Sequence, residues 1–251
     1  MLRVADSLPH PPSSREQAVR RAGRYQLIMA MVEPYVAELR TKHPDTKLYE
    51  YLQPTYRDKY NLGLTRDLPG DVYLDVADTT VRAELARRCK HYVARTGVDG
   101  IMLDTPFEVA PGTELAAAQL CADIQTAISP AGALVNFGDY ATWTNENNVP
   151  ELRRKAQAGL GQLMPYQLVE VGLDVSRFTQ TAWDRARGRM TTMLGRGKTV
   201  VFGIYDPAGQ RAQLAALLAC AYTHERLYYL YKTQAETPEE EQWNPWYAVA
   251  R

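Results

Sequence analysis

Apolar runs of four to nine residues recur along the whole chain and predict eight β-strands. These runs are LRVA (2–5), QLIMAMV (26–32), KLYEYL (47–52), GIML (100–103), ALVNF (133–137), GQLMPYQLV (161–169), TVVFGI (199–204) and LYYLY (227–231). A further extended segment, VYLDV (72–76), falls within a long connection over 53–78 that is rich in Tyr, Asp, Pro and Gly.

Between most of these runs the apolar residues take the spacing of an amphipathic helix. Val81, Leu85 and Cys89 share one stripe, and Leu120 and Ile124 lie four residues apart in a later segment. Helices are therefore expected at 80–96, 113–129, 150–158, 178–194 and 208–224.

Alternating strands and helices predict parallel strands joined by right-handed crossovers. Eight such units in a chain of this length favour a closed (β/α)8 TIM barrel, an α/β fold, over an open doubly wound sheet. VYLDV is then expected outside the barrel. The sequence contains no further repeat, low-complexity segment or linker, so we expect a single domain over 1–251.

Composition and charge exclude several classes of partner. The 251 residues are 45% hydrophobic and 23% charged, as in an ordinary globular domain. Lys plus Arg equal Asp plus Glu at 29 each, which disfavours a nucleic-acid partner. No apolar run approaches the roughly 20 residues of a membrane span. The first 30 residues lack the pattern of a secretory signal, so we expect a cytoplasmic protein or part of a particle exported by another route.

No metal or cofactor motif is present in the sequence. Cys89, Cys121 and Cys220 have neither zinc spacing nor close partners for a disulfide, and the four histidines lie far apart. GRGKT (195–199) contains Gly-Lys-Thr but lacks the first glycine of a phosphate-binding loop and precedes a strand. A dinucleotide fingerprint is also absent from the sequence, so we expect no cofactor.

Polar residues follow the predicted strands, where loops at the carboxyl ends of barrel strands build active sites. Asp104 comes directly after GIML. The other candidates near strand ends are Glu33, Gln53, Asn136, Asp139, Tyr166, Gln167, Glu170, Tyr205 and Asp206, while Tyr56, Tyr60, Tyr73 and Asp75 in the long connection are expected to overhang the cleft. Simpler structural roles are open for each: Asp104 could cap its loop, Asp139 could form a turn and Glu170 could be merely exposed.

This mixture of acids, amides and tyrosines suggests a carbohydrate site. As a glycoside hydrolase, the protein would use Asp104 together with Glu170, Asp139 or Asp206 as a pair of catalytic carboxyls. As a non-catalytic barrel, it would hold a glycan through Tyr and Asn contacts, as a subunit of a larger particle or cell-surface assembly. The C-terminal segment 237–251, with two tryptophans, could close the barrel mouth or dock a partner.

The segment VYLDVADTTVRAELARRCKHYVARTGVDGIMLDTP resembles the hypothetical glycosyl hydrolase family fifteen, with DGIMLD in place of that family's strand-four signature. YQLIMAMVEPYVAELRTKHPDTKLYEYLQ and ALVNFGDY are similar to its second, third and fifth strand regions, so the resemblance runs from about 24 to about 140. It implies a TIM barrel acting on polysaccharide or glycoconjugate, with Asp104 as the strand-four acid and Asn136 as a sugar contact. Strand six departs from the expected pattern, because Tyr166 and Gln167 stand where a second acid is expected.

Overall fold

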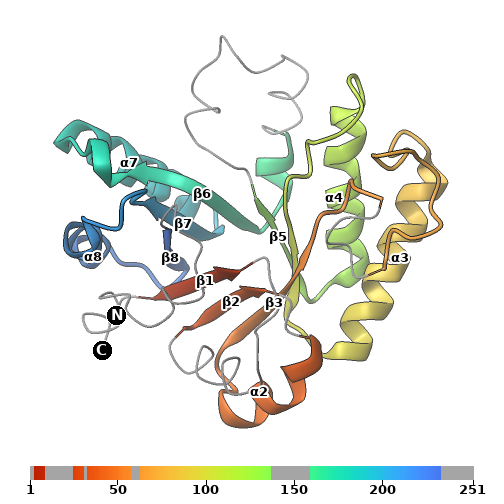
Figure 1. The fold of residues 1–251 in the computed structure, drawn as a ribbon, viewed down its shortest axis with the longest axis horizontal. Coiled ribbons are helices and arrows are strands. Elements are labelled where there is room, and N and C mark those ends of the chain that lie inside the picture. The colour runs from red at the N-terminus through yellow and green to blue at the C-terminus, as the bar shows by residue number, and fades with distance from the viewer. Residues whose placement is uncertain (1–2, 9–24, 31–32, 58–62, 137–158, 233–251) are drawn as a thin grey trace.

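The computed structural model describes residues 3–8, 25–30, 33–57, 63–136 and 159–232. Its eight strands form a closed barrel in which every neighbouring pair is parallel, β1 with β8 included (Figure 1). The strands are β1 (Val4–Leu8), β2 (Leu27–Ala30), β3 (Lys47–Leu52), β4 (Gly100–Leu103), β5 (Gly132–Asn136), β6 (Tyr166–Asp174), β7 (Thr199–Tyr205) and β8 (Leu227–Lys232). The predicted parallel barrel sheet is confirmed.

Helices pack outside this sheet, with α3 and α4 on one side and α7 and α8 on the other (Figure 1). Among the described residues the labelled helices are α2 (Val36–Lys42), α3 (Thr79–Thr96), α4 (Glu114–Ile128), α7 (Gln180–Gly195) and α8 (Ala212–Ala221), with 3-10 turns η1 (Glu33–Tyr35) and η2 (Val175–Arg177). Four of the expected helices are confirmed to within a few residues. The fifth, at 150–158, lies outside the described residues.

Helix α3 shows how local sequence sets these boundaries. The Asp78 side chain accepts a hydrogen bond from the Thr80 backbone N–H at 2.7 Å and so caps the first turn. Gly97 ends the helix with φ of 72°, a left-handed conformation that suits glycine. Between these ends Val81, Leu85 and Cys89 are buried, as the apolar stripe predicts.

The core has layers on both sides of the barrel wall. Inside the barrel, Tyr49, Tyr51, Met102, Leu134 and Leu168 belong to one buried cluster. Alternate residues of the same strands, such as Leu52, Ile101 and Val135, pack outward against α3 and α4. This alternation decides which strand-end side chains turn toward the barrel axis.

The sequence misplaces β6 by about five residues. Residues 159–163 are helical, and Leu160 and Met164 pack into the outer core beside α4. Pro165, which has no backbone N–H to donate, precedes the strand. The apolar run that predicts a strand over 161–169 is therefore the end of a helix followed by the start of β6.

The described residues of the long connection, 53–57 and 63–78, lie outside the barrel sheet, as expected for VYLDV. Within these two ranges Tyr56 pairs with Tyr73 and Gly70 pairs with Leu74, each as an isolated antiparallel bridge. Among the described residues, no helix has the length and apolar character needed to cross a membrane.

Candidate active site

Three polar side chains form a row at the carboxyl ends of β3, β4 and β5. Leu52 pairs with Leu103, and Leu103 pairs with Val135, so Gln53, Asp104 and Asn136 occupy the next level of three adjacent strands. Each side chain continues the inward-facing series of its strand, which points it into the barrel mouth. The expectation that Asp104 and Asn136 are neighbours is confirmed.

Both carboxylate oxygens of Asp104 accept hydrogen bonds. Asn136 Nδ2 donates to Oδ1 at 2.6 Å, and the Tyr51 hydroxyl donates to Oδ2. Gln53 Nε2 donates in turn to the Tyr51 hydroxyl at 3.2 Å. We name Tyr51, Gln53, Asp104, Thr105 and Asn136 the mouth cluster. Since a carboxylate can only accept, this arrangement suits the ionised form of Asp104.

Two atoms of the mouth cluster keep unused hydrogen-bonding capacity. Gln53 Oε1 and Thr105 Oγ1 are buried and have no hydrogen-bond partner within the described part of the chain. Leaving such atoms without a partner costs free energy, so they are suited to contact a bound polar molecule or water. Both lie within one residue of the mouth row.

The backbone after Asp104 is strained. Thr105 has φ of 44°, although a β-branched residue rarely adopts the left-handed region. Such a conformation costs about 1–3 kcal/mol and is concentrated at functional sites, because surrounding contacts must hold it there. The strain therefore marks the turn that presents Asp104.

Asp206 follows β7 but is engaged with the neighbouring elements. Its side chain is 1% exposed, and Oδ2 accepts hydrogen bonds from the Arg211 backbone N–H at 2.6 Å and the Tyr231 hydroxyl at 2.9 Å. These bonds fix the turn that leads into α8. Tyr205, half-buried at the end of β7, precedes it directly.

Two predicted acids lie wholly or partly outside the described residues. Asp139 lies outside the described residues. Glu170 is within β6, but its side chain is also outside the described part. Glu33 turns away from the mouth, since it accepts a hydrogen bond from Tyr92 at 3.1 Å and forms an ion pair with Arg95 at 2.6 Å, both on α3.

The expected position of Tyr166 is wrong. Tyr166 is the first residue of β6, and it lines a cavity at the amino-terminal end of the barrel, opposite the mouth cluster. Gln167 faces the helical segment before β6, because its Nε2 donates to the Gly161 and Met164 carbonyls at 2.6 and 3.3 Å. The cause is the early placement of strand six described above.

Tyr73 and Asp75 line a depression of about 450 Å³ between the long connection and the start of α4. The Tyr73 ring lies 5.0 Å from that of Tyr56, and the Tyr56 hydroxyl donates to Glu108. This bond raises the pKa of Tyr56 above its ordinary value. The loops after β3 and β4 are thereby joined on the same end of the barrel as Asp104.

Tyr51 is the residue of the candidate site that sequence reasoning missed. The signal available was its position two residues before Gln53 in β3, since alternation puts both side chains on the inner face.

Among the described residues, no group of three or more His, Cys, Asp or Glu side chains is arranged to hold a metal ion.

Comparison with solved structures finds carbohydrate-active barrels. A maltogenic α-amylase from Thermotoga neapolitana superimposes with a TM-score of 0.61 at 8% identity, covering 98% of this chain and 74% of that one. An endo-β-N-acetylglucosaminidase from Cordyceps militaris gives 0.58 at 7% identity, covering 100% and 90%. A chitinase from Pseudoalteromonas aurantia gives 0.54 at 9% identity, covering 97% and 98%.

No family model matches the chain, and no curated protein matches it in sequence. At identities of 7 to 9% these likenesses concern the fold alone. The chain has the parallel barrel sheet and outer helices of these TIM-barrel glycosidases.

Proposed function

We propose that this protein is a glycoside hydrolase acting on a polysaccharide or glycoconjugate, with Asp104 as one of its two catalytic carboxyls. The observation that carries the proposal is the Asp104 carboxylate at the barrel mouth, held by donors from Tyr51 and Asn136. Glycosidase neighbours in fold support it, and so does the resemblance of DGIMLD to the strand-four signature of hypothetical family fifteen. We also propose that the remaining connections complete a (β/α)8 pattern and that 1–251 is one domain.

The contacts of Asp104 favour a role in its ionised form. A carboxylate that accepts from two side chains is suited to attack the anomeric carbon, to activate water or to stabilise positive charge on the sugar ring. The complementary acid must then protonate the leaving oxygen. Glu170 from β6 and Asp139 after β5 are the preferred candidates, because the Asp206 carboxylate already fixes the start of α8.

Sugar contacts are assigned to polar atoms around Asp104. Gln53 Oε1 and Thr105 Oγ1 are buried without partners among the described residues and would bind sugar hydroxyls. Asn136 orients the carboxylate and Tyr205 stands near the mouth at the end of β7. Tyr73 and Asp75 would contact more distant sugar units in the adjoining depression.

A non-catalytic carbohydrate-binding barrel is the second candidate, as a subunit of a larger assembly. It is favoured by one observation: the side chains beside Asp104 in the mouth row are the amides of Gln53 and Asn136, and neither is an acid. Such a barrel would bind glycan through the same cluster without cleaving it.

The test compares Asp104→Asn with wild type in a reducing-end assay on a panel of polysaccharides, together with glycan binding. Loss of a catalytic carboxyl should lower hydrolysis by about 10²-fold or more, while glycan affinity largely persists. Asp184→Asn is the matched control, because Asp184 lies on the solvent side of α7 and the change is chemically identical. Glycan binding without turnover by wild type would favour the second candidate, and equal activity of both variants would refute the role of Asp104.

A further inference from the structure

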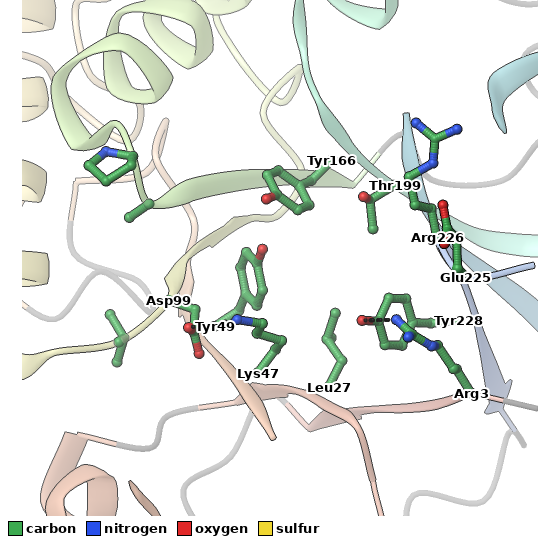
Figure 2. A pocket seen from close by; sticks show the side chains of 13 residues that line it. Arg3, Leu27, Lys47, Tyr49, Asp99, Tyr166, Thr199, Glu225, Arg226 and Tyr228 are labelled. Carbon is green, nitrogen blue, oxygen red and sulfur yellow. Dashed lines mark hydrogen bonds and ion pairs between the residues drawn. The ribbon is translucent and has the colours of Figure 1, made fainter. Parts of the chain in front are cut away.

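The amino-terminal end of the barrel contains a cavity of about 430 Å³, at the end opposite Asp104. Its wall is formed by residues that begin the strands or directly precede them, including Arg3, Lys47, Tyr49, Tyr166 and Tyr228 (Figure 2). The volume lies within the range of about 300–1,000 Å³ that is common for small-molecule sites. Nothing in the proposed hydrolysis at the mouth requires this space.

Glycines and tyrosines occupy the inward positions at this end of the barrel. The inner layers of such barrels are generally closed by bulky branched side chains. Here Gly100 and Gly132 occupy inward positions at the start of β4 and β5, and a Cβ at Gly132 would lie 2.6 Å from the Tyr166 ring. A Cβ at Gly100 would lie 2.7 Å from Tyr49. The rings of Tyr49 and Tyr166 therefore pack against the two glycines, and both tyrosines line the cavity.

Three tyrosines, Tyr49, Tyr166 and Tyr228, supply apolar ring faces and hydroxyl groups to the cavity (Figure 2). The rings of Tyr49 and Tyr166 lie 5.9 Å apart and are tilted by 57°. Burial, and to a lesser degree Tyr166 and Asp99, raise the pKa of Tyr49 well above its ordinary value. The Tyr49 hydroxyl thus stays protonated at neutral pH and can act as a hydrogen-bond donor.

Arg3 and Arg226 line the cavity without a carboxylate partner among the described residues, and Arg3 is the one whose guanidinium lies over a tyrosine ring of the cavity. Its guanidinium lies 5.5 Å above the Tyr228 ring and donates to the Tyr228 hydroxyl at 3.1 Å, with no carboxylate partner in the described part of the chain. Lys47, by contrast, pairs with Asp99 at 3.4 Å, and the same carboxylate pairs with Arg40 at 2.6 Å. Arg226 donates from Nη2 to the Leu194 carbonyl at 3.1 Å, which directs its guanidinium toward the end of α7, although its buried Nε has no partner among the described residues.

We propose that this cavity binds a small organic anion whose carboxylate pairs with Arg3 and whose planar apolar part lies among Tyr49, Tyr166 and Tyr228. A guanidinium can bind a carboxylate through two parallel N–H donors, and aromatic walls favour a flat apolar body. The exposed carboxyl of Glu225 at the rim disfavours a multiply charged anion. This site is independent of the proposed hydrolase function.

The test titrates the full-length protein with benzoate and with benzamide, its neutral isostere, followed by NMR and calorimetry. Wild type should bind benzoate saturably and at least about tenfold more tightly than benzamide, because only the anion gains the charge-assisted bonds. Equal binding of the two compounds, or no saturable binding of benzoate, overturns the proposal without recourse to any variant.

Variants then locate the site. Arg3→Gln should weaken benzoate binding by about tenfold or more, and Arg3→Lys should lose less because it keeps the charge. Arg177→Gln is the matched control, since the Arg177 side chain is 90% exposed on η2. Asp104→Asn should leave benzoate binding unchanged. If Asp104→Asn rather than Arg3→Gln altered the affinity, benzoate would be bound at the mouth and the inference would be wrong.

Discussion

The hydrogen bond between Tyr51 and Asp104 predicts thermodynamic coupling that can be measured without a substrate. Tyr51→Phe removes the hydroxyl that donates to Asp104 Oδ2 and accepts from Gln53 Nε2 at 3.2 Å. A hydrogen bond to a charged group contributes about 1.5–3 kcal/mol. Because Asp104 is half-buried and water can replace part of the interaction, we expect the lower part of that range.

The assay is a double-mutant cycle of Tyr51→Phe and Asp104→Ala, in which guanidinium unfolding gives the free energy of unfolding of all four proteins. The coupling free energy should be about 1.5–2 kcal/mol. Tyr231→Phe with Asp206→Ala provides a positive control, since that pair is bonded at 2.9 Å and Asp206 is 1% exposed. Tyr51→Phe with Asp75→Ala should be additive.

A coupling of less than about 0.5 kcal/mol between Tyr51 and Asp104 would refute the reasoning, because unconnected sites add to within that amount. The positioning role of Tyr51 in the mouth cluster would then be withdrawn. The double-mutant cycle does not depend on turnover, so this result is separate from the test of hydrolysis.

Two further predictions concern packing and thiol reactivity. Gly172→Ala should lower Tm by several degrees, because the new Cβ would lie 2.3 Å from Phe202 and such overpacking costs about 1–3 kcal/mol. Gly188→Ala on α7, where a Cβ would meet open space, should instead raise Tm slightly because alanine has the higher helix propensity. If thermal denaturation showed Tm shifts of the same sign for both variants, the close packing of Gly172 against Phe202 would be contradicted. At pH 8 a thiol reagent should modify exposed Cys220 in the native protein but spare Cys89 and Cys121. Burial raises the pKa of both of these thiols, that of Cys89 to about 12. Reaction of all three cysteines without unfolding would refute this prediction.

The strand boundaries show which parts of the fold the local sequence pattern predicts. KLYEYL and GIML coincide with β3 and β4, because a short apolar run bounded by polar residues has one stable register in a parallel sheet. GQLMPYQLV is ambiguous, since apolar residues of a buried helix end and a buried strand look alike over such a length. Because the sequence pattern placed strand six about five residues too early, Tyr166 was expected at the carboxyl end of the barrel, whereas it lies at the amino-terminal end.

The sequence by itself determined that the chain forms parallel strands with amphipathic helices and that Asp104 and Asn136 follow two of those strands. These properties depend on periodicity and on chain order, which are local. Only the tertiary structure decided that Tyr51 donates to Asp104, that Asp206 is committed to the start of α8, and that Arg3 shares a cavity with Tyr228. Arg3 and Tyr228 are 225 residues apart, and only barrel closure between β1 and β8 brings such distant residues into contact.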